Sequence, residues 1–221
     1  MNPEIIIMLT NNDITVTNAE EVFESCKDLP AKKWGFKDIG LPKEEMIQLA
    51  KKMKDAGKET YIEVVTYTEE GCLEGAKLAY ECGFDYLTGA LPFDSVFEYA
   101  KEHNLKYSPF CGTVGGSPVA LSGTIVASAK DCIAKGATGV DLTAYRYVDG
   151  NPIELTRAVV EAIGADKVCI AGSVGNVERM NEMKEAGVAE YTMGSALFNA
   201  NFVKDGTFRE NLEFVLDYLK K

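Results

Sequence analysis

Short apolar runs alternate with longer amphipathic runs along the whole chain. The short runs are rich in β-branched and aromatic residues, which is typical of buried strands. The longer runs repeat apolar residues three and four positions apart, which is typical of helices with one buried face. The pattern predicts strands at 4–10, 32–39, 60–66, 84–89, 105–112, 138–145, 167–172 and 190–194. Predicted helices follow at 17–27, 42–56, 69–82, 92–103, 124–135, 152–163, 177–186, 195–199 and 208–220.

The order of these elements predicts a parallel α/β fold. Each strand is followed by a helix, and the links are too short for successive strands to pair antiparallel. Eight strand–helix units in 221 residues favour closure into a (β/α)8 TIM barrel. An open doubly wound sheet is the alternative, but no GxGxxG motif follows the first strand. Since no linker or low-complexity run interrupts the pattern, residues 1–221 are expected to form one domain.

Two Gly-Ser pairs mark the ends of the last two predicted strands. Gly172-Ser173 follows the seventh strand and Gly194-Ser195 follows the eighth, and a helical segment begins after each pair. Glycine permits a tight turn and a close approach, and a helix that begins there presents free N–H groups. Two such turns side by side predict a phosphate-binding site, and a short extra helix after strand eight accompanies such sites in barrels. The alternative is that both pairs serve only turns and N-caps.

Side chains alternate along a strand, so each strand can be divided into an outward and an inward face. Trp34 and Phe36 suit the helix layer, and Lys37 then points into the barrel. The same reasoning on the third and sixth strands turns Glu63 and Asp141 inward. Charges inside a barrel are costly unless they are paired, so we predict that Lys37, Glu63 and Asp141 are catalytic. The alternative is an ion network that only fills the barrel.

Further residues near the predicted mouth are candidates for substrate contacts. Thr88 lies at the inner rim of the fourth strand, and Cys111 ends the fifth beside a glycine-rich loop at 112–123. That loop is either a lid over the substrate or an ordinary surface loop. Arg146 follows the sixth strand, where it either reaches the substrate or pairs with Asp149. Asp13, after the first strand, is a weaker candidate for a third acid.

Composition narrows the class of protein. The net charge of −11 disfavours nucleic acid and anionic membranes as partners, so an anionic substrate would need a locally positive pocket. The chain has no long apolar run and no signal-peptide pattern, and its six cysteines form no CxxC motif, so we expect reduced thiols and a cytoplasmic location. His103 is the only histidine and falls at a predicted helix end. A Ser/His/Asp triad is thereby excluded, and we expect neither a metal nor another cofactor.

The ending GS…MGSALF resembles the ribulose-phosphate-binding barrel superfamily. This group includes sugar-phosphate epimerases, isomerases, decarboxylases and aldolases of the ketodeoxyphosphogluconate type, and residues 84–199 are similar to the aldolases in layout. The resemblance implies a phosphorylated metabolite as substrate. The sequence also differs from the pattern of each branch. The aldolases carry a Schiff-base lysine on the sixth strand, where this chain has Asp141. The decarboxylases carry an Asp-x-Lys motif on the third strand, where Glu63 is followed two residues on by Val65, and the epimerases use metal-binding histidines.

A lysine beside carboxylates is suited to proton transfer next to a carbonyl group. The expected function is therefore that of an isomerase or epimerase, or an aldolase-type lyase, acting on a sugar phosphate or a keto acid phosphate. A Schiff base on Lys37 requires that burial lower the pKa of that lysine. The alternatives are a non-catalytic sensor of phosphorylated metabolites, as in barrels that resemble a regulator of glycerol-operon transcripts, and a barrel that binds FMN. The sequence leaves a homo-oligomer open.

Overall fold

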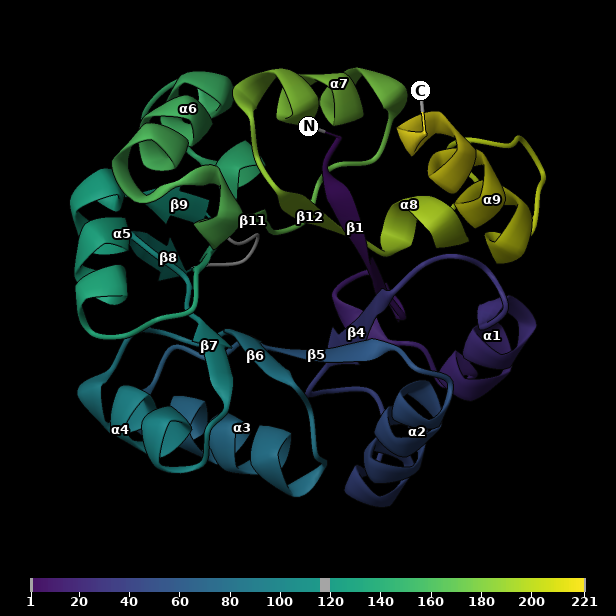
Figure 1. The fold of residues 1–221 in the computed structure, drawn as a ribbon, viewed down its shortest axis with the longest axis horizontal. Helices are drawn as coiled ribbons and strands as arrows, with labels where there is room; N and C mark the ends of the chain where they lie inside the picture. Colours follow the sequence, from purple (N-terminus) through teal and green to yellow (C-terminus); the bar gives the residue numbers. More distant parts are fainter. Residues whose placement is uncertain (1, 116–119, 221) are drawn as a thin grey trace.

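The computed structural model describes residues 2–115 and 120–220. Eight parallel strands form one sheet that curves into a nearly closed barrel, which confirms the predicted TIM-barrel fold (Figure 1). Around the barrel the strands follow the order β10 (Val140–Leu142), β11 (Val168–Ile170), β12 (Glu190–Met193), β1 (Glu4–Met8), β4 (Lys33–Lys37), β5 (Glu59–Val64), β6 (Tyr86–Gly89) and β7 (Lys106–Ser108).

The seam of the barrel lies between β7 and β10. There the Thr138 N–H donates to the Tyr107 carbonyl at 2.8 Å, and the Asp141 N–H donates to the Pro109 carbonyl at 2.9 Å. Phe110 and Asp141 form an isolated parallel bridge at the same place. These bonds satisfy backbone groups that would otherwise be unpaired at the edges of an open sheet. Their effect is to join the first and last strands of the sheet order.

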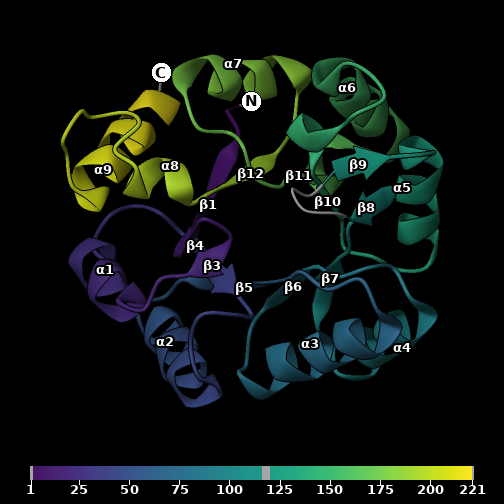
Figure 2. The same ribbon diagram turned by 180° about the vertical axis from the view of Figure 1, so that it is seen from behind.

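The helices form a ring outside the strands (Figure 2). They are α1 (Ala19–Cys26), α2 (Lys43–Asp55), α3 (Glu69–Glu81), α4 (Asp94–Glu102), α5 (Ile125–Ala134), α6 (Pro152–Ile163), α7 (Val177–Ala186), α8 (Ser195–Phe198) and α9 (Phe208–Leu219), with 3-10 turns at Ala144–Arg146 and Ala165–Lys167. Each predicted helix is present, with ends that differ by at most a few residues. None of the helices described is both long and apolar enough to cross a membrane.

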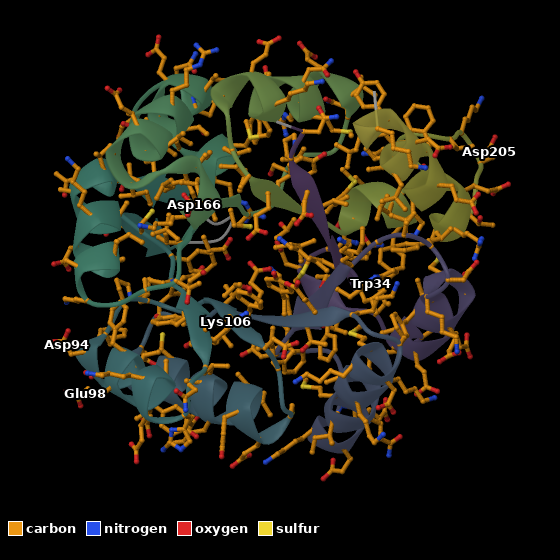
Figure 3. The ribbon with its side chains drawn as sticks, viewed as in Figure 1. Trp34, Asp94, Glu98, Lys106, Asp166 and Asp205 are labelled. Atoms are coloured by element: carbon orange, nitrogen blue, oxygen red, sulfur yellow. The ribbon has the colours of Figure 1, made fainter. Side chains whose placement is uncertain are left out.

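Two apolar layers hold the barrel together, and Figure 3 shows how side chains fill them. The larger layer lies between strands and helices and includes Trp34, whose ring packs edge-on against Phe23 at 5.2 Å. The smaller layer contains Ile6, Met8, Tyr61 and Cys169, with Tyr86 packed against it. Alternate residues of one strand fall in different layers, so the predicted division into outward and inward faces holds for these strands.

Two β-hairpins at the carboxyl ends of the strands were not predicted. The first pairs β2 (Thr10–Asn11) with β3 (Ile14–Thr15), directly after β1. The second pairs β8 (Thr113–Gly115) with β9 (Ala120–Ser122), so the stretch expected to be a loop is partly paired. The predicted lid, residues 112–123, contains this second hairpin, and its residues 116–119 lie outside the described part of the chain.

An ion cluster occupies the opposite, amino-terminal mouth of the barrel. The ammonium of Lys33 lies 2.7 Å from Glu4 and 2.5 Å from Glu190. These residues come from three adjacent strands, β4, β1 and β12. The cluster keeps its charges paired where the barrel interior meets solvent.

Candidate functional site

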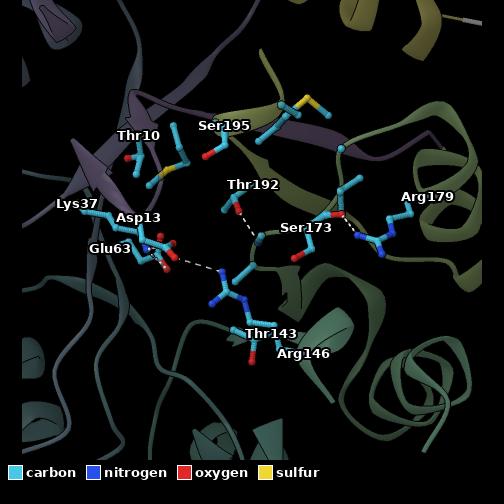
Figure 4. A pocket seen from close by; sticks show the side chains of 18 of the residues that line it. Thr10, Asp13, Lys37, Glu63, Thr143, Arg146, Ser173, Arg179, Thr192 and Ser195 are labelled. Atoms are coloured by element: carbon cyan, nitrogen blue, oxygen red, sulfur yellow. Dashed lines mark hydrogen bonds and ion pairs between the residues drawn. The ribbon is translucent and has the colours of Figure 1, made fainter. Parts of the chain in front are cut away.

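A cavity of about 450 Å³ opens at the carboxyl-terminal mouth (Figure 4). Its wall is formed by strand ends and by the connections after β1, β10, β11 and β12. Among the predicted site residues, those that line this cavity are Lys37, Glu63, Arg146, Gly172, Ser173, Gly194 and Ser195. Lys37 and Glu63 lie at one side, and the two Gly-Ser turns lie at the other (Figure 4).

The turn after β11 has a backbone shape that only a few residue types adopt readily. Gly172 and Ser173 both have positive φ, at 72° and 64°. A non-glycine residue in this region is uncommon and is often found at functional sites. The Gly172 N–H donates to the Thr192 hydroxyl at 2.9 Å, which ties the turn to β12. The carbonyl of Ser173 accepts a hydrogen bond from Arg179 at 2.5 Å, which fixes the other side of the turn.

The turn after β12 lies against the first strand and its hairpin. A Cβ on Gly194 would lie 2.6 Å from the Thr10 carbonyl oxygen, so no larger residue fits there. The next residue, Ser195, accepts a hydrogen bond from the Asn12 N–H at 3.0 Å. Beyond α8, the Asn201 side chain donates to the Gly175 carbonyl at 3.0 Å and links the segment after β12 to the loop after β11. The two Gly-Ser turns are therefore held side by side, as the sequence predicted.

Two arginines give this side of the cavity a local positive charge in a chain of net charge −11. Arg179, in the first turn of α7, has its guanidinium 4.2 Å above the ring of Tyr145. A Cβ on Gly172 would lie 3.7 Å from Arg146 Nη2, so Arg146 lies close to the same turn. Arg179 was not among the site residues predicted from the sequence. Its position one helical turn after a Gly-Ser loop is the signal that could have identified it.

The opposite side of the cavity holds a chain of charged groups. The ammonium of Lys37 lies 2.8 Å from Asp13 Oδ1 and 3.7 Å from Glu63 Oε1. The other oxygen of the Asp13 carboxylate, Oδ2, lies 3.6 Å from Arg146 Nη2, so Arg146 pairs with Asp13 and not with Asp149. Lys37 and Glu63 are 7 % and 8 % exposed. Such buried charges are stable because each is close to an opposite charge.

The surroundings of Lys37 keep its ammonium charged. Burial lowers the pKa of Lys37, but the carboxylates of Glu63 and Asp13 raise it more, and the pKa lies above its ordinary value. A Schiff base on Lys37 would require a lowered pKa, and the direction found here is the opposite. A charged ammonium is suited to stabilise a negative oxygen on a substrate.

The first hairpin brings Asp13 to Lys37. Asn12 and Asp13 form its two-residue turn, with φ of 49° and 63°. Both residue types tolerate this conformation, which is the signal for a hairpin in Asn11-Asn12-Asp13. The buried hydroxyl of Thr15 donates to the Lys37 carbonyl at 2.8 Å and accepts from the Lys37 N–H at 2.9 Å. The hairpin is thus fastened to β4 at the residue that Asp13 contacts.

Asp141 does not line the cavity, which corrects its expected place in the barrel mouth. It pairs in register with Cys169, whose side chain belongs to the inner apolar layer, and Thr143 lies two residues nearer the mouth. The Asp141 side chain is 1 % exposed, and neither carboxyl oxygen has a hydrogen-bond partner among the described residues. Burial raises the pKa of Asp141 well above its ordinary value, and nearby Glu63 raises it further. The inward orientation was predicted correctly, but not the depth.

Thr88 and Cys111 do not line the cavity either. The Thr88 hydroxyl donates to the Ile62 carbonyl at 3.3 Å, and Cys111 is buried in the layer between strands and helices, where burial raises the pKa of its thiol. Their places do not support the predicted substrate contacts. Two other threonine hydroxyls lie in the wall of the cavity. Thr10 and Thr143 line the cavity, and their buried hydroxyl oxygens have no partner among the described residues.

Comparison with solved structures places this fold among known barrels. The native KDPGal structure is similar to this one, with a TM-score of 0.70 at 14 % identity. The match covers 100 % of this chain and 98 % of that chain. Orotidine 5'-phosphate decarboxylase from Pyrococcus horikoshii gives a TM-score of 0.71 at 14 % identity, over 98 % of this chain and 99 % of that one. The chain therefore shares the (β/α)8-barrel fold of these two proteins.

The barrel fold by itself does not decide the function. A glycerol uptake operon antiterminator regulatory protein from Listeria monocytogenes has a TM-score of 0.58 at 14 % identity, over 88 % of this chain and 93 % of its own. Enzymes and a regulator therefore share this architecture. No protein-family model matches the chain, and no curated protein matches it in sequence.

Proposed function

We propose that this protein is an enzyme that binds a small phosphate monoester and transfers a proton next to a carbonyl group of that substrate. One observation carries the proposal. A single cavity is lined by two adjoining Gly-Ser turns with two arginines on one side, and by Lys37 and Glu63 on the other. The first side is suited to an anion that does not react, and the second side is suited to the reacting atoms.

The phosphate is proposed to lie against Ser173, Gly194 and Ser195, within reach of Arg179 and Arg146. Backbone N–H groups at such turns bind phosphate oxygens, and arginines neutralise the remaining charge. The narrow fit around Gly194 and the fixed turn at Gly172 give the anion a preformed site. Preformed sites bind more tightly because less ordering is needed on binding.

In the proposed reaction the Glu63 carboxylate takes a proton from the carbon beside the carbonyl group. The electron pair of that C–H bond moves into the carbonyl, and the resulting enediolate oxygen is stabilised by the Lys37 ammonium. When Glu63 returns the proton to the same carbon from the other face, the product is an epimer. When it returns the proton to the former carbonyl carbon, and the hydroxyl proton of the first carbon moves to the former carbonyl oxygen, the product is an isomer. Cleavage of a carbon–carbon bond through the same enediolate is the lyase form of this chemistry. Asp141, which lies beneath the cavity near Glu63, is proposed to stay protonated as a neutral acid and not to contact the substrate.

The test is a thermal-shift screen of the protein against phosphorylated metabolites, with inorganic phosphate and FMN included. A ligand that binds the native state raises the melting temperature by mass action. Sugar phosphates that raise it are then assayed for isomerisation, epimerisation and cleavage. Stabilisation by FMN alone would favour the flavin barrel, and binding without turnover would favour the sensor. If no phosphorylated compound raises the melting temperature, the proposal is wrong.

Arg179 provides the matching prediction for the phosphate side. We expect Arg179→Met to weaken the binding of inorganic phosphate by about tenfold, because it removes one charge-assisted contact. Arg157→Met is the control, since Arg157 is an exposed arginine on α6 that does not line the cavity. Isothermal titration at fixed ionic strength measures both variants. Equal phosphate affinity in wild type and Arg179→Met would contradict the proposed cradle.

A further inference from the structure

The β2–β3 hairpin connects the two sides of the cavity. On one side, Thr15 is bonded in both directions to the backbone of Lys37. On the other side, the Asn12 N–H donates to the hydroxyl of Ser195, in the predicted phosphate side. A Cβ on Gly40 would collide with the Thr15 carbonyl, so the next connection packs closely against the hairpin. The turn residue Asp13 is therefore held in one place over the cavity mouth.

The carboxylate of Asp13 lies between Lys37, on the reacting side of the cavity, and Arg146, on the phosphate side. One oxygen is 2.8 Å from Lys37, and the other is 3.6 Å from Arg146 (Figure 4). Burial raises the pKa of Asp13, but the two cations lower it more, so the group is ionised at neutral pH. A lysine and an arginine that face one space would bind a carboxylate of a ligand well. In this protein Asp13 already takes that position.

We propose that Asp13 is a specificity-determining residue that excludes substrates with a carboxylate at the reacting end. Its own carboxylate fills the anion position between Lys37 and Arg146, so the site accepts a phosphate monoester whose reacting end is uncharged. The inference rests on the proposed function and narrows it, because it selects sugar phosphates over keto acid phosphates.

The charges that line the cavity agree with this choice. Lys37, Arg146 and Arg179 are cationic, and Asp13 and Glu63 are anionic. A phosphate dianion on the arginine side already exceeds the remaining positive charge. A substrate carboxylate beside Lys37 would then face two fixed carboxylates with no free cation to pair with. A further negative charge placed beside two fixed carboxylates opposes binding.

Two probes with the same carbon skeleton test the proposal. Glycerol 3-phosphate and 3-phosphoglycerate both carry three carbons and one phosphate, and they differ in a neutral CH₂OH end against a carboxylate end. We expect wild type to bind glycerol 3-phosphate about tenfold or more tightly than 3-phosphoglycerate. Asp13→Asn is expected to reduce this preference about tenfold, because the repelling carboxylate is lost and both cations become available. Isothermal titration at constant ionic strength gives both affinities.

The variants are chosen to keep the hairpin folded. Asparagine tolerates the positive φ of residue 13, and Asp13→Gly creates an Asn-Gly turn, which is favoured in two-residue hairpins. Asp205→Asn is the control for net charge, because Asp205 also has positive φ, at 58°, and lies away from the cavity (Figure 3). That control is expected to keep the wild-type preference.

The outcomes separate this inference from the proposed function. Equal binding of both probes by wild type, or an unchanged preference in both Asp13 variants, would overturn the role of Asp13 and leave phosphate binding intact. Failure of glycerol 3-phosphate and inorganic phosphate to bind any form would overturn the proposed function, and the inference with it. A preference that falls in both Asp13 variants and not in Asp205→Asn would support the inference.

Discussion

Replacing Lys37 with methionine is expected to lower kcat by about 10²- to 10³-fold on the substrate that the screen identifies. Among the described residues, the Lys37 ammonium is the only cation of the cavity that forms an ion pair with Glu63. Its loss removes a stabilising charge that matters mainly in the transition state. KM should change much less, because the phosphate side is intact. Steady-state kinetics separate the two parameters.

Lys33 offers a closely matched control for this experiment. It lies on the same strand and also pairs with two carboxylates, Glu4 and Glu190, but at the opposite mouth of the barrel. Lys33→Met should therefore lower stability without a comparable loss of kcat. Phosphate titration of Lys37→Met verifies that the cavity is still formed. Full turnover in a folded Lys37→Met protein would show that Lys37 does not stabilise the reacting oxygen.

Asp141→Asn is expected to make the protein more stable at neutral and alkaline pH. The pKa of Asp141 is raised in the folded protein, so the native state keeps a proton that the unfolded chain has released. Stability then falls as pH rises from the unfolded pKa, near 4, toward the folded pKa, by up to about 1.4 kcal/mol per pH unit. Below both pKa values the two states are equally protonated and this loss is absent. Asparagine has no such proton to lose.

The measurement is urea unfolding from pH 4 to pH 9, and the decisive quantity is the difference in unfolding free energy between variant and wild type. We expect that difference to grow with pH. Asp205→Asn, at an exposed position, serves as the comparison for the loss of one acidic group. A difference that stays constant across this range would show that Asp141 is ionised in the folded protein. In that case its proposed role as a neutral acid near Glu63 would also be wrong.

Lys37 and Asp141 illustrate how one barrel interior holds both a charged and a neutral ionisable group. The ion pair between Lys37 and Glu63 offsets the free-energy cost of burying each charge, and Asp13 adds a second negative charge beside the lysine. Asp141 has no cation in contact among the described residues, so its neutral form is favoured. An active site that transfers protons benefits from such a difference, since one group accepts a proton while another retains one.

The sequence determined the architecture and the direction of the side chains. Alternation in the strand around Lys37 separated Trp34 and Phe36 from the barrel interior, because a strand buried on both faces must divide its residues between them. The glycine and serine at the ends of β11 and β12 identified the two adjoining turns, because backbone shape there depends on local residue type. Both features are local, and local features can be read from one chain.

The depth of each inward residue was decided only by the tertiary structure. Asp141 and Thr143 face the same interior, but the stagger of neighbouring strands places one beneath the cavity and the other in its wall. The same holds for contacts between distant segments. Asp13 meets Lys37 and Arg146 only because the barrel brings the connections after β1 and β10 together at its mouth. Sequence spacing carries no information about such distances, and they decide which charges act together.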